Sequence, residues 1–177
     1  KLTFTLRTEQ SEAINEIKKT DFSICVAPPG FGKTLLGAKI FEQRTCTTMI
    51  VVNKNMLLNQ WIERFVDYFG YTKKDIGYLG KGHNKLNGII DVATMQSLKN
   101  APEIINNCSF VIVDECHHIP AITFEQIIKN FKGKYILGLS ATPNRKDDLQ
   151  PILYQQLGEI SYEYKKKRTH TNKLQII

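Results

Sequence analysis

The stretch APPGFGKT, residues 27–34, decides how this chain folds. An apolar run at residues 22–26 precedes it, and apolar side chains follow it at helical spacing through residues 35–41. This order predicts a strand, a glycine-containing turn and a helix. Backbone N–H groups at such a turn can bind phosphate oxygens, and the positive end of the helix attracts the same anion. The ammonium of Lys33 can reach the outer phosphates, and the hydroxyl of Thr34 can ligate Mg²⁺.

The turn alone leaves a second interpretation open. An ordinary connection between a strand and a helix also contains glycines, and the standard phosphate-loop pattern begins with Gly where this chain has Ala27. The later part of the sequence must therefore decide between a phosphate site and a plain turn.

The overall composition is that of a single globular domain. The 177 residues are 42% hydrophobic and 23% charged. The formal net charge of +7 favours an anionic partner, nucleic acid first, although a well-solvated basic surface explains the charge equally well. The sequence has neither a secretory leader nor a long apolar segment, so we expect no membrane partner and a cytoplasmic, nucleoid or nuclear location. Cys25 and Cys108 lie in or beside apolar runs, as buried thiols do.

Short apolar strands alternate with amphipathic helices along the rest of the chain. We expect Asn53 to cap the helix that follows it, Gly70 to end that helix, and a polar loop at 80–87. Uniformly apolar strands in this alternation predict a mostly parallel sheet that helices cover on both faces. The patterns predict strands at 22–26, 48–52, 76–79, 89–93, 109–113 and 135–139 and helices at 10–19, 35–41, 57–69 and 121–131.

A pair of acidic residues, Asp114 and Glu115, follows directly on the apolar strand at 109–113. Ligands bind beyond the carboxyl ends of strands in open parallel sheets, so we expect this pair at the same edge as the phosphate turn. Asp114 is suited to hold the Mg²⁺ of a bound nucleotide, and Glu115 to orient or deprotonate a water that attacks the terminal phosphate. Two solvated acids at a strand end are the alternative.

Three segments stand in order, each after a predicted strand: residues 27–34, Asp-Glu-Cys-His at 114–117, and Ser-Ala-Thr at 140–142. Together they resemble superfamily 2 helicases and translocases of the Asp-Glu-x-His type, whose phosphate loop opens with Ala as this one does. The resemblance covers nearly the whole chain as one motor lobe. It implies an α/β fold, a RecA-like three-layer sandwich with a mostly parallel central sheet, and ATP and Mg²⁺ as cofactors.

The resemblance assigns a role to each residue of the nucleotide site. Gln10 would read the edge of the adenine, while Lys33, Asp114 and Glu115 are the implied catalytic residues. Thr34 and Asp114 are the implied Mg²⁺ ligands. The whole implied nucleotide site comprises Arg7, Gln10, Pro29, Gly30, Phe31, Gly32, Lys33 and Thr34.

Two further groups of residues are implied to link the nucleotide to nucleic acid. His117, Ser140 and Thr142 would relay the state of the nucleotide to nucleic-acid binding and to a second lobe. The segments at 52–61 and 93–98 resemble elements that meet the nucleic-acid backbone, and hydroxyl or amide groups that hold phosphates give grip without reading sequence. The family often has Pro-Thr where this chain has Asn-Lys at 53–54. The implied nucleic-acid contacts are Asn53, Lys54, Thr94 and Gln96.

Residues 60–61, 77–82 and 138–145 are similar to the XPB and UvsW branch and to its relatives among restriction-enzyme motor subunits. The implied function is ATP hydrolysis coupled to translocation on, or unwinding of, DNA, which is favoured over RNA. Two alternatives stay open. One is the DNA-translocating subunit of a restriction complex, and the other is a non-motor, ATP-dependent nucleic-acid-binding switch.

We expect residues 1–164 to form the ATP-binding lobe and residues 165–177 to be a basic linker or tail toward a second RecA-like lobe. The first residue is Lys1 rather than Met, so we expect a piece of a longer protein. Family motors complete their site with an arginine from the second lobe. We therefore expect little or no ATPase or unwinding activity from this chain alone.

Two residue patterns have competing interpretations. Trp61 falls on the apolar stripe of its helix, so we expect it in the core rather than as a base-stacking platform. The run Cys116-His117-His118 raises the question of a zinc site. Adjacent residues do not easily turn toward one ion, and the chain has no paired Cys-x-x-Cys spacing, so we expect no zinc.

Overall fold

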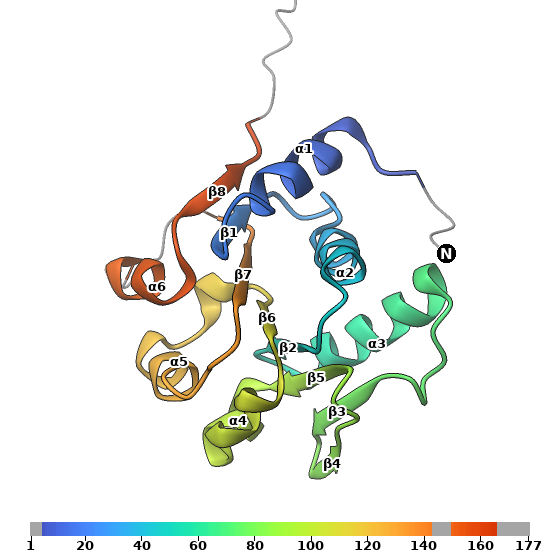
Figure 1. Cartoon of the computed structure of the whole chain (residues 1–177), viewed down its shortest axis with the longest axis vertical. Coiled ribbons are helices and arrows are strands. Elements are labelled where there is room, and N and C mark those ends of the chain that lie inside the picture. Colours follow the sequence, from blue (N-terminus) through green and yellow to red (C-terminus); the bar gives the residue numbers. More distant parts are fainter. Residues whose placement is uncertain (1–4, 143–149, 166–177) are drawn as a thin grey trace, which may run out of the picture.

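The computed structural model describes residues 5–142 and 150–165, which form three layers (Figure 1). The middle layer is an eight-stranded sheet with the order β4-β3-β5-β2-β6-β7-β1-β8. All pairs of neighbouring strands in it are parallel except β3 with β4, so the predicted mostly parallel sheet is confirmed. The strands are β1 (Phe22–Val26), β2 (Thr48–Val52), β3 (Gly77–Gly80), β4 (His83–Lys85), β5 (Ile90–Thr94), β6 (Phe110–Val113), β7 (Tyr135–Ser140) and β8 (Ile160–Glu163).

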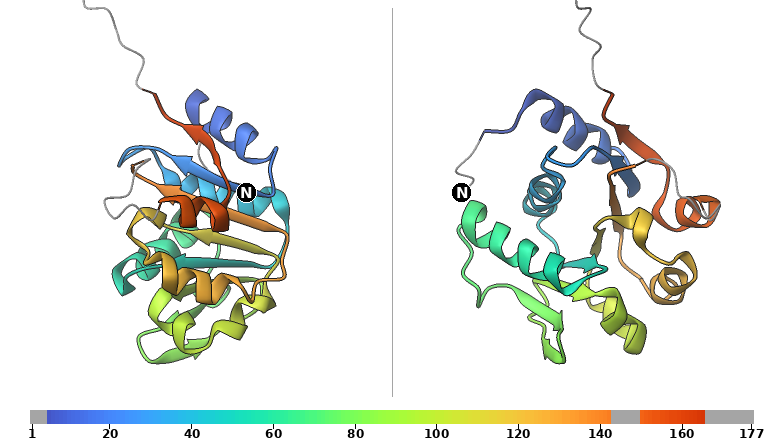
Figure 2. Two further views of the ribbon diagram at one scale, coloured as in Figure 1. Left: turned by 90° about the vertical axis from the view of Figure 1, so that its left-hand side faces the viewer. Right: turned by 180° about the vertical axis from the view of Figure 1, so that it is seen from behind.

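Helices cover both faces of the sheet, as predicted (Figure 2). Helices α1, α2 and α3 pack on one face, and α4, α5 and α6 pack on the other. Strands β2, β5 and β6 are buried along their whole length, which agrees with their largely apolar sequences, although β5 also buries Asp91. The helices are α1 (Thr8–Ile17), α2 (Lys33–Arg44), α3 (Asn55–Phe69), α4 (Met95–Asn100), α5 (Ala121–Ile128) and α6 (Gln150–Leu157), with short 3₁₀ turns η1 (Pro102–Asn107) and η2 (Cys116–His118).

Helix α3 begins at Asn55, so the prediction that Asn53 caps it is wrong. The N-cap is Lys54, whose carbonyl oxygen accepts the N–H of Leu58. Lys54 is extended, with φ −138° and ψ 146°, because the chain needs both residues after β2 to leave the strand and turn into the helix. Gly70 ends α3 in the left-handed conformation, at φ +72°, as predicted.

The predicted polar loop at 80–87 contains a strand that the sequence patterns do not reveal. Strand β4 pairs with β3, and Lys81 and Gly82 form the turn with φ of +55° and +76°. Two consecutive positive φ values match the right-handed twist of a hairpin. All three residues of β4 are exposed and polar, which protects the sheet edge from pairing with another chain. Elements α4, η1, α6 and β8 are also unpredicted, because segments this short show little periodicity.

The buried side chains agree with the expectations for the core. Cys25 and Cys108 are buried, and burial raises the pKa of each thiol to about 12. Trp61 is 1% exposed, so its predicted place in the core is confirmed. In the described parts of the chain, no three His, Cys, Asp or Glu side chains are grouped to hold a metal ion, and no helix has the length and apolar character to cross a membrane. The expected tail lies, from residue 166 on, outside the described residues.

Candidate active site

Five predicted segments meet at one edge of the sheet. Strands β1, β2, β5, β6 and β7 are parallel, so their carboxyl ends lie at the same edge. The sheet therefore brings the predicted nucleotide residues and the predicted nucleic-acid residues to one side of the molecule. The segments that follow these strands are 27–34, 53–54, 94–97, 114–117 and 140–142.

The phosphate loop depends on two glycines in left-handed conformations. Gly30 has φ +79° and Gly32 has φ +90°, values that other residues rarely adopt. Gly32 is the N-cap of α2, and a Cβ atom there would lie 2.6 Å from Nε2 of Gln10. The glycines thus let the loop fold closely against α1 at the start of α2. The first N–H groups of α2 have no partner within the helix and are suited to bind an anion.

Lys33 lies at the floor of the site and is only 9% exposed. Its Nζ donates to the carbonyl oxygen of Ala27 at 2.9 Å and lies 3.5 Å from Oε1 of Glu115. The ammonium is therefore held between the loop and the second motif, from which it can exchange its partners for phosphate oxygens.

Asp114 follows β6 and is 6% exposed. Its Oδ2 accepts the indole N–H of Trp61 at 2.8 Å, and its Oδ1 accepts the backbone N–H of Glu115 at 3.0 Å. Burial raises the pKa of Asp114 above its ordinary value, while the hydrogen bond from Trp61 and the charge of Lys33 oppose this rise. A cation bound in the pocket would stabilise the charge of this buried carboxylate.

Glu115 is one of the few residues other than glycine with a left-handed backbone, at φ +47° and ψ 48°. Its carboxylate lies between Lys33 and His117, with Oε2 3.4 Å from Nδ1 of His117. This Oε2 is buried and has no hydrogen-bond partner among the described residues. An uncommon backbone conformation and an unsatisfied buried oxygen together favour a functional role over a merely solvated strand end.

The three predicted coupling residues also come together. Nδ1 of His117 lies 3.0 Å from Oγ of Ser140, and the Ser140 hydroxyl donates to the carbonyl oxygen of Thr142. The N–H of Thr142 donates back to Oγ of Ser140 at 3.3 Å. The end of β7 is therefore tied to the segment that carries Glu115.

Arg7 and Gln10 both hold the phosphate loop by hydrogen bonds to the carbonyl oxygen of Phe31, and Nη2 of Arg7 also lies 3.5 Å from the carbonyl oxygen of Gly30. Nε2 of Gln10 donates to the Phe31 oxygen at 2.7 Å and Nη2 of Arg7 donates to it at 2.5 Å, while the N–H of Arg7 donates to Oε1 of Gln10. The Phe31 ring packs against Tyr162 and Tyr164, and the guanidinium carbon of Arg7 lies over it at 5.6 Å from the ring centroid. The backbone of Phe31 is thus part of the predicted site, whereas its side chain supports the loop from behind.

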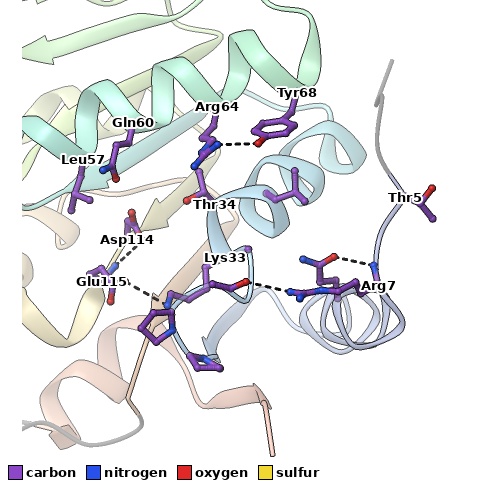
Figure 3. Close-up of a pocket in the computed structure, with 16 residues that line it drawn as sticks. Thr5, Arg7, Lys33, Thr34, Leu57, Gln60, Arg64, Tyr68, Asp114 and Glu115 are labelled. Atoms are coloured by element: carbon purple, nitrogen blue, oxygen red, sulfur yellow. Dashed lines mark hydrogen bonds and ion pairs between the residues drawn. The ribbon is translucent and has the colours of Figure 1, made fainter. Parts of the chain in front are cut away.

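A pocket of about 580 Å³ joins the two motifs (Figure 3). Lys33, Asp114 and Glu115 point toward one another in it, and side chains of α3 line its other side. Among these, Arg64 and Tyr68 are not predicted from the sequence, and Gln60 is predicted only as part of a segment that meets nucleic acid, although the spacing of four residues marks one face of a helix. The lining consists of Thr5, Arg7, Gln10, Pro28, Pro29, Gly30, Gly32, Lys33, Thr34, Leu35, Leu57, Gln60, Arg64, Tyr68, Asp114 and Glu115.

The predicted nucleic-acid residues lie at the same edge but do not line this pocket. Thr94 is buried, and its hydroxyl accepts the N–H of Ser97 and donates to Oγ of Ser97. It therefore caps α4 in this structure, and its hydroxyl proton is already in use. Lys54 and Gln96 are exposed, while Oδ1 of Asn53 is buried without a hydrogen-bond partner in the described part of the chain.

Comparisons with known proteins identify the family of this chain. The profile of the family described as "Type III restriction enzyme, res subunit" matches residues 3–145. "DNA 3'-5' translocase XPB2" of Sulfurisphaera tokodaii is 36% identical over 160 residues, which are 89% of this chain and 35% of that protein. "Probable helicase D10" of Escherichia phage T5 is 32% identical over 148 residues, 83% of this chain and 32% of that protein. The UvsW helicase of bacteriophage T4 superposes with a TM-score of 0.77 at 23% identity, over 90% of this chain and 60% of that one. The chain spans about a third of the length of the two sequence relatives.

Proposed function

Because the chain belongs to the family described as the res subunit of type III restriction enzymes, we propose that it is the ATP-binding lobe of a DNA motor. The expected place among superfamily 2 helicases and translocases, in the XPB, UvsW and restriction branch, is confirmed by these matches. In the proposal, hydrolysis of ATP to ADP and phosphate drives translocation on DNA or its unwinding. The motor acts wherever its DNA lies, in the cytoplasm, nucleoid or nucleus.

In this proposal the phosphate loop binds the triphosphate of ATP. The backbone N–H groups around Gly30 and Gly32 and the ammonium of Lys33 supply the positive charge. Lys33 leaves Glu115 when phosphate oxygens take the place of the carboxylate. Gln10 reads the adenine edge, and Arg7 holds the loop in shape beside it.

The donor set on the metal side of the pocket fits Mg²⁺, which prefers oxygen ligands. The hydroxyl of Thr34 and the carboxylate of Asp114 line the same pocket as Lys33 and would hold the ion. When bound, Mg²⁺ neutralises charge on the transferring phosphoryl group. Asp114 contributes a negative charge that is already desolvated and hydrogen-bonded, so little rearrangement is needed.

Glu115 orients the attacking water and accepts its proton. Its carboxylate is free for this role once Lys33 has turned to the phosphates. Its buried Oε2 has no hydrogen-bond donor in the described part of the chain and can accept one from the water. Through His117 and Ser140, a change at Glu115 reaches the end of β7 and Thr142. This route is the proposed relay to nucleic-acid binding and to a second RecA-like lobe.

DNA binds along the same edge of the sheet, at the ends of β2 and β5. Lys54 and Gln96 offer exposed side chains to the backbone, while Asn53 and Thr94 supply polar groups beside them. Thr94 must give up its bond to Ser97 before its hydroxyl can donate to a phosphate. The second lobe supplies an arginine that completes the ATP site, so this chain alone turns over ATP slowly or not at all.

The description of the matching family favours a second candidate, the DNA-translocating subunit of a restriction complex. A nuclease domain elsewhere in the full-length protein would favour this candidate, and a second lobe without a nuclease would favour a general translocase. A switch that binds ATP without moving DNA would be expected to lose Glu115 or Lys33, and this chain has both.

The observation that carries the proposal is the convergence of Lys33, Asp114 and Glu115 on one pocket. Lys33→Ala removes the ammonium that binds the outer phosphates. We expect at least a hundredfold loss of affinity for Mg·ATP in this chain, measured with a fluorescent ATP analogue, and loss of DNA-stimulated ATPase in a form with the second lobe. Lys39→Ala, on the same helix but outside the pocket lining, is the matched control. Unchanged affinity and ATPase in Lys33→Ala would refute the proposal.

A further inference from the structure

Trp61, in the middle of α3, makes a polar contact inside the core. The indole is 1% exposed, yet its N–H donates to Oδ2 of Asp114 at 2.8 Å. The other carboxylate oxygen accepts the N–H of Glu115. The backbone thus holds one carboxylate oxygen of Asp114, and Trp61 holds the other.

The orientation of the indole is fixed from the opposite side by α2. A Cβ atom added to Gly37 would lie 2.9 Å from Cη2 of Trp61, so only glycine at this position leaves room for the ring. On α3, the ring of Phe65 lies one turn further along, with its centroid 6.1 Å from that of Trp61. The indole is packed tightly between α2 and α3, so its N–H has little freedom to point elsewhere.

We propose that Trp61 is a positioning residue for Asp114, which ties the metal side of the ATP pocket to helix α3. The inference rests on the proposed function, in which Asp114 holds Mg²⁺. A hydrogen bond from a donor that is itself fixed by packing holds the buried carboxylate in one rotamer. The contact therefore prepares Asp114 for the ion, while the contacts of Lys33 with the phosphates do not depend on it.

Helix α3 has a second connection to the same pocket. Its outer face contributes Gln60 and Arg64 to the lining, and its first turn follows directly on Lys54 at the expected DNA contact. A displacement of α3 would therefore move the indole N–H relative to Asp114. In this arrangement, the position of α3 sets how well the carboxylate can hold Mg²⁺.

Trp61→Phe removes the N–H and keeps an aromatic ring in the core. The measured quantity is the gain in affinity that Mg²⁺ gives, namely the ratio of dissociation constants for a fluorescent ATP analogue in EDTA and in Mg²⁺. We expect Trp61→Phe to lower this gain about tenfold, at the low end for a bond to a charged group. Affinity in EDTA should change by less than about twofold.

Phe69→Leu is the matched control, because Phe69 is buried two turns away on the same helix and has no polar atom to offer Asp114. It should lower the free energy of unfolding and leave the Mg²⁺ gain intact. In an Asp114→Asn background, Trp61→Phe should have no further effect on the gain, since the two residues act as one unit. Equal losses in Trp61→Phe and Phe69→Leu, or a full effect in the Asp114→Asn background, would overturn the inference.

The unmodified chain offers a test that needs no variant. Trp61 is its single tryptophan, so the indole N–H resonance in a nitrogen-15 NMR spectrum is assigned without ambiguity. Saturation with Mg·ATP analogue should shift this resonance, whereas the analogue in EDTA should shift it far less. Only the inference fails if Lys33→Ala weakens nucleotide binding while two other results hold: Mg²⁺ does not shift the indole resonance, and Trp61→Phe has the same Mg²⁺ gain in affinity as the wild type. If the chain binds no nucleotide, the proposed function fails and the inference with it.

Discussion

Two buried aspartates in one sheet differ in what surrounds them. Asp91, near the start of β5, is 5% exposed and accepts the N–H groups of Asn87 and Gly88 at 2.8 and 2.9 Å. Asp114, at the end of β6, is 6% exposed and accepts one N–H from its own loop and one from Trp61. The turn before β5 thus satisfies Asp91, whereas Asp114 depends on a helix far away in the sequence.

The spaces beside the two aspartates differ as well. The cavity beside Asp91, about 290 Å³, has no cationic side chain in its described lining. The pocket beside Asp114 is about twice that size and contains Lys33 and the open end of α2. Burial by itself therefore does not identify a functional acid. The strand end at which the acid lies, and the charges that face it, make the difference.

Glu115→Gln, at the carboxyl edge of the sheet beside Asp114, should have the largest effect of the variants in this comparison. Loss of the proton acceptor should lower DNA-stimulated ATPase about 10²–10⁴-fold in a form with the second lobe, while affinity for Mg·ATP changes little. Steady-state turnover and equilibrium binding separate the two effects. Glu125→Gln, at an exposed position on α5, is the control and should leave both unchanged. Retained turnover in Glu115→Gln would assign the water-activating role to another group.

Asp91→Ala tests the other side of the comparison. The substitution removes the hydrogen-bond acceptor of the two N–H groups in the 87–88 turn. It should therefore lower the free energy of unfolding by about 1–3 kcal/mol. Urea denaturation measures this change. Affinity for Mg·ATP should stay within about twofold of the original. A large loss of nucleotide affinity with unchanged stability would mean that the two aspartates do not differ as described.

Asp114→Asn tests the burial of the other aspartate through the pH dependence of stability. Burial raises the pKa of Asp114 above 3.8, so the folded protein binds this proton more tightly than the unfolded chain does. Stability is therefore lost as the pH rises from 3.8 through the raised pKa, and at neutral pH the buried charge destabilises the fold. The neutral Asn removes this charge, although its single amide oxygen serves only one of the two N–H groups that the carboxylate accepts. Relative to the wild type, the variant should therefore gain about 0.5–2 kcal/mol of unfolding free energy between pH 4 and pH 7.

The pH dependence provides the check on Asp114→Asn. Urea unfolding between pH 4 and pH 7 should show the advantage of the variant growing with pH, because only the wild-type protein loses a favoured proton. A stability difference that does not move in favour of the variant as the pH rises would contradict the direction of the pKa shift.

The smallest expected effect concerns the DNA contact. Lys54→Ala should weaken DNA binding a few-fold regardless of sequence and reduce the salt dependence, the slope of log K against log salt, by about 1. Lys129→Ala removes the same charge at the end of α5, which lies at the opposite edge of the parallel sheet, and should change neither quantity. Equal effects of the two variants would point to a diffuse basic surface instead of a site.

The sequence predicts the parts of this site that are local. The glycine turn, the apolar strand before Asp114 and the spacing of the three motifs are each visible within a few residues, and the parallel order of the strands then brings them together. The contact between Trp61 and Asp114 is different, because it joins residues 53 positions apart and depends on which strands are neighbours. The apolar stripe correctly predicts burial of Trp61 but says nothing of its polar partner.

Thr94 shows a second limit. A hydroxyl before a helix start serves either as a cap or as a ligand donor, and both fit the same sequence. In the structure it caps α4, a helix of six residues that is too short to be recognised by periodicity. The hairpin strand β4 was missed for a similar reason, since its three polar residues resemble a loop.

The convergence of Lys33, Asp114 and Glu115 is tested most directly by a crystal structure of the chain with Mg²⁺ and a non-hydrolysable ATP analogue. The account predicts outer phosphates against Lys33 and the first N–H groups of α2, with the ion between Thr34 and Asp114. It also predicts that Lys33 has left the carboxylate of Glu115. A nucleotide bound elsewhere, or one whose phosphates face away from these three side chains, would contradict it.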